Sequence, residues 1–99
     1  MAELPEKIIV LGQEFTVKLS PDMMEGDYGN CLGMEYLIKI SDKLSPEIAA
    51  QTLFHEAIHA AFYVSGIAEI VTNKQEEAIV VMIENAFRHI IDIQKLTKP

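Results

Sequence analysis

The sequence predicts an α+β fold: a small antiparallel sheet of three to four strands, followed by a helix and an antiparallel C-terminal helix. Two observations support this prediction. Strand-like apolar alternation fills much of the chain before residue 45, and two long stretches with helical periodicity follow it. The 99 residues, 49% of them apolar, suffice for one hydrophobic core. We therefore expect a single domain over residues 1–99, without a linker.

The strand signals lie in the first half of the chain. Residues 7–19 form two apolar runs around Gly12 and Gln13, which predicts a hairpin. Residues 29–40 alternate apolar and polar side chains towards their end, so a further β segment is expected there. The strand over 34–40 is expected at the edge of the sheet, where an extended peptide can add backbone hydrogen bonds.

The two helices are expected from their capping residues. Ser45 can cap a helix, and Pro46 suits the first helical position, so the first helix should begin there. It should end at Gly66, because glycine readily takes the left-handed conformation after a helix. Asn73 is expected to cap the last helix, which runs to about Lys95. The short connector between the helices predicts an antiparallel pair.

Charge and composition exclude several classes of partner. The formal net charge of -7 disfavours binding to phosphate backbones, so a nucleic acid is not an expected partner. The apolar runs are too short to span a bilayer, and the N-terminal residues lack the order of a secretory signal. The single cysteine, Cys31, cannot form an internal disulfide. We expect a cytoplasmic protein without a membrane partner, and the composition leaves its oligomeric state open.

The segment His55-Glu56-Ala57-Ile58-His59 contains the residues that indicate a metal site. Histidines four residues apart on a helix project from one face, so both can reach one zinc ion. Glu56 lies beside the position that water would occupy, where it can accept a proton. Isolated histidines are more often ordinary surface or partly buried residues. Here, however, two of the three histidines have the ligand spacing with a carboxylate between them. The third, His89, is not expected to be a ligand.

A catalytic zinc site needs a third protein ligand. Phe62 and Ser65 stand where the metzincin pattern requires glycine and histidine, so the ligand is sought further along the chain. Glu76 is the preferred candidate, because it falls near the middle of the apolar stripe of the last helix, where a metal would offset a buried charge. The alternative role for Glu76 is a capping box with Asn73. Glu77 is the second candidate ligand.

Several segments outside the HExxH motif also resemble known proteins. They are Tyr28-Gly29-Asn30-Cys31, Leu53-Phe54-His55-Glu56-Ala57-Ile58-His59-Ala60, Val64-Ser65-Gly66-Ile67 and Glu76-Glu77-Ala78-Ile79-Val80. Together they resemble zincin metallopeptidases of the gluzincin type, and in particular short HExxH proteins encoded by phages and prophages. The chain is more distantly similar to ImmA/IrrE-type metallopeptidases, which act on regulatory proteins. One departure is Val80, since many gluzincins carry Asp or Asn one turn after the ligand glutamate.

These observations lead to a functional hypothesis with two alternatives. In the hypothesis, Zn²⁺ held by His55, His59 and Glu76 activates a water while Glu56 moves its proton, which hydrolyses a peptide or protein substrate. Tyr63 or Tyr28 would be the donor to the developing oxyanion, although packing is the simpler role for each. The first alternative is a non-catalytic, metal-stabilised protein-interaction module. The second is a helical adaptor without a metal.

Overall fold

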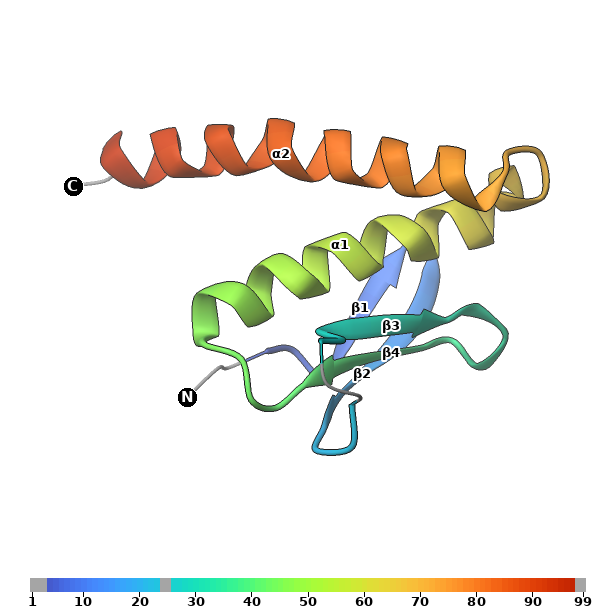
Figure 1. Cartoon of the computed structure of the whole chain (residues 1–99), viewed down its shortest axis with the longest axis horizontal. Coiled ribbons are helices and arrows are strands. Elements are labelled where there is room, and N and C mark those ends of the chain that lie inside the picture. Colours follow the sequence, from blue (N-terminus) through green and yellow to red (C-terminus); the bar gives the residue numbers. More distant parts are fainter. Residues whose placement is uncertain (1–3, 24–25, 98–99) are drawn as a thin grey trace.

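The computed structural model describes residues 4–23 and 26–97, with side chains as far as Arg88, and has the expected α+β fold (Figure 1). In chain order its elements are β1 (Lys7–Val10), β2 (Gln13–Ser20), β3 (Gly29–Leu32), the 3₁₀ helix η1 (Gly33–Glu35), β4 (Leu37–Ser41), α1 (Pro46–Ser65), the 3₁₀ helix η2 (Ile67–Glu69) and α2 (Asn73–Thr97). Four strands thus precede the two long helices, as the sequence predicts.

The sheet is mixed and has the strand order β1-β2-β4-β3. The pairs β1–β2 and β3–β4 are antiparallel, but β2 and β4 run parallel. The expectation of an antiparallel sheet therefore fails for this one pair. The reason is that β3 and β4 form a hairpin whose second strand inserts beside β2, so β4 points the same way as β2.

The segment 29–40 is not one continuous β segment. It is interrupted by η1 and by Tyr36, whose φ of 49° lies in the left-handed region. The strand expected over 34–40 becomes β4, which is paired on both sides and has no free edge. The prediction that this strand docks a peptide at the sheet edge is therefore wrong. The free edge on that side of the sheet belongs to β3.

The β1–β2 hairpin turns one residue earlier than expected. Leu11 and Gly12 both have positive φ, of 49° and 82°, and Gln13 already belongs to β2. Positive φ at both central residues is the requirement of a two-residue type I′ turn, whose twist matches that of the strands. The hairpin itself is confirmed.

Helix α1 has the expected ends. The Ser45 hydroxyl accepts a hydrogen bond from the Ile48 backbone N–H at 3.3 Å, and Pro46 is the first helical residue. Gly66 follows the helix with φ 83°, where a residue with a Cβ would be strained. The sequence prediction of α1 is confirmed at both ends.

One face of α1 packs on the sheet (Figure 1). The buried core between them contains Phe15, Val17, Ile38, Ile40, Ala49 and Ala60. Gly29, the first residue of β3, and Gly33, the first residue of η1, allow α1 to approach closely. A Cβ on Gly29 would lie 2.8 Å from Cγ2 of Thr52, and one on Gly33 would lie 2.6 Å from ring atoms of Tyr63. Both distances are too short for non-bonded carbon atoms, so these positions require glycine.

Helix α2 begins with a capping box, but not the expected one. The Thr72 hydroxyl accepts a hydrogen bond from the Gln75 N–H at 3.1 Å, and the Gln75 side chain accepts one from the Thr72 N–H at 2.8 Å. Asn73 is therefore the first residue of the helix and not its cap. The alternative role of Glu76 as the partner of Asn73 in a capping box is also wrong.

The antiparallel helix pair is confirmed. Helix α2 lies along the side of α1 away from the sheet, so α1 is the middle layer of the molecule (Figure 1). Val80 is completely buried, and the rings of Phe54 and Phe87 meet edge to face with centroids 6.1 Å apart. These contacts fix which side of α2 faces the histidines.

No helix in the described part of the chain is both long and apolar enough to cross a membrane.

Candidate metal centre

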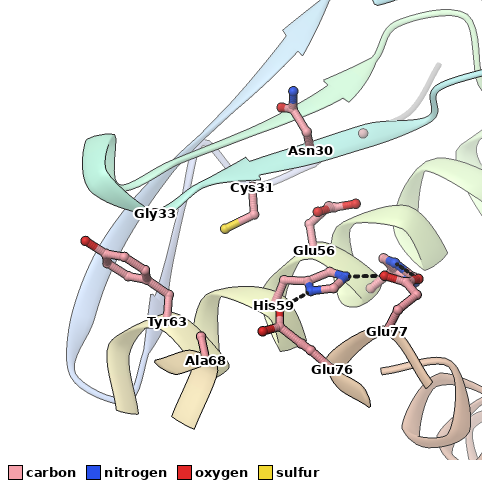
Figure 2. A pocket seen from close by; sticks show the side chains of 11 residues that line it. Asn30, Cys31, Gly33, Glu56, His59, Tyr63, Ala68, Glu76 and Glu77 are labelled. Atoms are coloured by element: carbon pink, nitrogen blue, oxygen red, sulfur yellow. Dashed lines mark hydrogen bonds and ion pairs between the residues drawn. The ribbon is translucent and has the colours of Figure 1, made fainter. Parts of the chain in front are cut away.

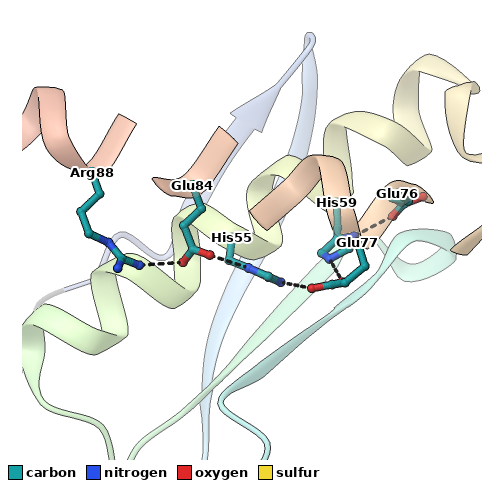
Figure 3. A network of polar contacts seen from close by, with 6 residues as sticks. All are labelled: His55, His59, Glu76, Glu77, Glu84 and Arg88. Carbon is teal, nitrogen blue, oxygen red and sulfur yellow. Dashed lines mark hydrogen bonds and ion pairs between the residues drawn. The ribbon is translucent and has the colours of Figure 1, made fainter. Parts of the chain in front are cut away.

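The two histidines of the HExxH motif lie between the helices. His55 and His59 are one turn apart on α1, on the side that faces α2, and their ring centroids are 5.0 Å apart (Figure 3). Their side chains are only 22% and 19% exposed. Both imidazoles are therefore partly buried between the two helices.

Glu77, in the first turns of α2, faces both imidazoles. Its Oε1 lies 3.3 Å from Nε2 of His55, and its Oε2 lies 3.0 Å from Nε2 of His59. One ligand atom from each of the three residues falls within 4.8 Å of the others, so the group can hold a metal ion. Tetrahedral zinc with ligands at about 2.0–2.1 Å has neighbouring ligand atoms about 3.3 Å apart. The two contacts of Glu77 agree with that spacing.

Glu76, the ligand preferred from the sequence, contacts the other nitrogen of His59. Its Oε2 lies 2.6 Å from Nδ1 of His59 (Figure 2). The structure therefore brings Glu76 to the histidine pair, but on the side away from the group formed with Glu77. Successive residues of a helix are rotated by about 100°, and the burial of Val80 against α1 sets the phase of α2. In this phase Glu77, the second candidate, faces both Nε2 atoms.

Glu84 completes the cluster, and sequence reasoning did not select it. Its Oε1 lies 3.1 Å from Nδ1 of His55, and its Oε2 lies 3.4 Å from an Arg88 nitrogen (Figure 3). A signal was present, because Glu84 follows Glu77 by seven residues, or two turns, on the same face of the helix. These two carboxylates, with Glu76, surround both imidazoles from α2.

Glu56 lies on the side of α1 that faces β3, next to the histidines (Figure 2). It is 7% exposed, and it is the only acidic or basic residue buried to that degree among those described. Burial raises the pKa of its carboxyl above the ordinary value, and the two histidines offset only part of that rise. A carboxyl of this kind accepts a proton and gives it up again more readily near neutral pH than an exposed glutamate does.

A groove runs along β3 past the cluster. It consists of two pockets of about 470 and 490 Å³ that share Gly29, His55, Glu56 and Glu77. The first pocket extends towards the end of α1, and the second extends towards its beginning and the loop before β3. His55, Glu77 and Glu56 therefore lie where the two pockets meet, beside the edge strand β3, and His59 lines the first pocket.

Cys31 projects from β3 into the first pocket (Figure 2). Burial, followed by the negative charges of Glu56 and Glu76, raises the pKa of its thiol to about 11. The thiol therefore stays protonated near neutral pH.

The remaining candidates from the sequence are peripheral. The Tyr63 ring lies over Gly33, and its hydroxyl points away from His59 in Figure 2. Tyr28 is 53% exposed and lines the second pocket. Tyr63 is 41% exposed and lines the first pocket. The side chain of His89 lies outside the described residues.

Comparisons with protein families, with curated proteins and with solved structures found no match. The resemblance to gluzincins stays an expectation from the sequence.

Proposed function

We propose that this chain is a zinc-dependent metallopeptidase with His55, His59 and Glu77 as ligands and Glu56 as general base. The observation that carries the proposal is the carboxylate of Glu77, which lies 3.3 and 3.0 Å from the Nε2 atoms of the two histidines. Glu56 lines the groove at the same point. Three ligands, a proton acceptor and an open groove are the parts that metal-assisted hydrolysis needs.

The chemistry is divided between the ion and the protein. When bound, zinc supplies Lewis acidity that polarises a peptide carbonyl and lowers the pKa of water. Glu56 takes the proton from the attacking water and passes it to the leaving amine, so that one peptide bond yields a carboxyl and an amino group. The raised pKa of the Glu56 carboxyl supports both transfers.

An extended peptide is the substrate that the groove suits best. The free edge of β3 offers backbone donors and acceptors beside His55 and Glu56, and a peptide strand can pair with it. Strand β3 has only four residues, so it can hold only a short stretch of substrate. We therefore propose an unfolded segment of a protein, or a free peptide, as the substrate.

The second candidate function is a non-catalytic interaction module in which zinc fastens α2 to α1. The three α2 carboxylates that contact His55 and His59 favour it, because each links the two helices. A purely structural site, however, is usually closed by four protein ligands. The open groove and the burial of Glu56 at its centre favour the enzyme.

Elemental mass spectrometry of the purified protein tests the metal site first. We expect close to one zinc per chain in the wild type and in Glu56→Gln, and little in His59→Ala and Glu77→Ala. Glu56→Gln is the matched control, since it alters the same helix and groove without removing a ligand. A wild-type chain that stays free of metal after incubation with zinc would rule out the peptidase.

Cleavage of a mixed peptide library, followed by mass spectrometry, then separates the two functions. The enzyme requires cleavage by the zinc-loaded wild type and none by zinc-loaded Glu56→Gln. Equal zinc content with no cleavage by either protein would favour the interaction module.

The cytoplasmic location and the lack of nucleic-acid or membrane partners stay predictions from the sequence.

A further inference from the structure

Both histidines use their second ring nitrogen in the same way. Nδ1 of His59 lies 2.6 Å from Glu76, and Nδ1 of His55 lies 3.1 Å from Glu84. The Nε2 atoms of both rings face Glu77 instead. Each imidazole is therefore held between two carboxylates of α2, and only Glu77 is shared.

A metal ion in the space that Glu77 and both Nε2 atoms face would require one tautomer of each ring. A neutral imidazole carries one N–H, which then lies at Nδ1, where Glu76 accepts it from His59 and Glu84 accepts it from His55. The lone pair then lies on Nε2, directed towards the space that Glu77 also faces. Two lone pairs beside a carboxylate repel one another unless a cation lies between them, so the hydrogen bonds at Nδ1 prepare Nε2 for a metal ion.

The two supporting carboxylates are themselves held in place. Each is only 16% exposed at the side chain. Arg88, one turn after Glu84, lies 3.4 Å from the oxygen that His55 does not use. Glu76 lies immediately after the Thr72–Gln75 capping box, which fixes the first turn of α2. Neither carboxylate is free to turn into the ligand position of Glu77 without losing its histidine.

We propose that Glu76 and Glu84 are positioning residues, which fix His59 and His55 as Nδ1–H tautomers with Nε2 directed to the metal, and that Arg88 holds Glu84 for this purpose. The inference rests on the proposed zinc site.

The test compares Glu76→Gln, Glu84→Gln and Arg88→Ala with the wild type and with Glu69→Gln, which removes an exposed carboxylate from η2. Zinc affinity is measured by competition with a chromophoric chelator. The visible spectrum of the Co²⁺-substituted protein reports ligand geometry, and the thermal midpoint without metal reports folding. We expect about 10- to 100-fold weaker zinc binding for Glu76→Gln and Glu84→Gln, with an altered cobalt spectrum. Arg88→Ala should lose less affinity than Glu84→Gln.

The outcomes separate this inference from the proposed function. If the wild type binds zinc and Glu76→Gln and Glu84→Gln bind as tightly as Glu69→Gln, the positioning role is overturned while the metal site stands. If these two variants lose only metal-free thermal stability, with affinity and cobalt spectrum unchanged, their role is structural and the inference is again overturned. A wild type that binds no zinc overturns both proposals.

Discussion

The thiol of Cys31 shows how strongly the groove acts on a single side chain. Its pKa of about 11 compares with an ordinary value of 9.0, and burial is the largest cause. The thiolate is the reactive form, so the fraction available at pH 8 falls about 100-fold. The rate at which Cys31 reacts with an alkylating reagent therefore reports how far its surroundings raise the pKa of the thiol.

We predict that iodoacetamide alkylates Cys31 at pH 8 roughly 100-fold more slowly in the native protein than in the protein unfolded in urea. Glu56→Gln should react faster than the wild type, because it removes a neighbouring negative charge that raises the pKa of the thiol. Mass spectrometry of timed samples measures both rates. Equal rates in native and unfolded protein would contradict the assigned environment.

The choice between Glu76 and Glu77 marks the limit of sequence reasoning at the residue scale. The HExxH motif followed from its spacing, and a carboxylate of the last helix was expected as the third ligand from the apolar stripe of that helix. Which of two adjacent glutamates faces the Nε2 atoms depends on the rotation of α2, and a step of one residue changes it by about 100°. Two contacts set that rotation: the burial of Val80 against α1, and the hydrogen bond from the Gln75 N–H to the Thr72 hydroxyl. Neither contact follows from the spacing of the glutamates.

At the scale of the element, the start of α2 gives a matched pair of substitutions. Thr72→Ala removes the hydroxyl that caps the helix, so we expect the free energy of unfolding to fall by about 1 kcal/mol. Asn73→Ala should change it by much less, because Asn73 is the first helical residue and makes no capping bond with its side chain in the described structure. Urea denaturation of both variants measures the difference, and a larger loss for Asn73→Ala would contradict the observed cap.

The packing of α2 on α1 provides a second pair. Val80 is completely buried, whereas its neighbour Val81 is 41% exposed. Val80→Ala should therefore lower the free energy of unfolding by about 2 kcal/mol, from lost burial and the cavity left behind. Val81→Ala should cost less than about 0.5 kcal/mol. Similar losses for the two variants, measured by urea unfolding, would mean that α2 packs with a different face.

The positions of the strands along the chain could be predicted from the sequence, but their order in the sheet could not. Apolar alternation locates a strand on the chain, but it carries no information about its neighbours in the sheet. Strand β4 pairs with β2, so β3 lies at the edge, although η1 joins β3 and β4 as neighbours in either order. Only the pairing contacts distinguish this arrangement from a simple meander, so the docking edge was assigned to the wrong strand.

At the scale of the whole molecule, the proposed site would couple metal binding to folding. The proposed ligands come from both α1 and α2, so an ion that binds them holds two layers together. An unfolded chain lacks this site, and binding therefore adds to stability by mass action. The formal net charge of -7 adds self-repulsion, which a bound cation partly relieves.

We predict that free zinc at 100 times its dissociation constant stabilises the wild type by about 2.7 kcal/mol. For a domain of this size the thermal midpoint should rise by roughly 10 to 20 °C. His59→Ala and Glu77→Ala should show little of this rise, and EDTA should reverse it in the wild type. Differential scanning calorimetry measures the effect. An equal rise in His59→Ala would show that zinc binds elsewhere.

The parallel pairing of β2 with β4 also has a consequence for the order of events during folding. The two strands can pair only after residues 21–36 have turned back, and such non-local pairing is slow because the closed loop costs entropy. The proposed zinc ligands lie instead on two helices joined by a short connector. If closure of the sheet limits the folding rate, contacts between these two helices can form before that step, so bound zinc stabilises the transition state as well as the native state. Zinc should then speed folding.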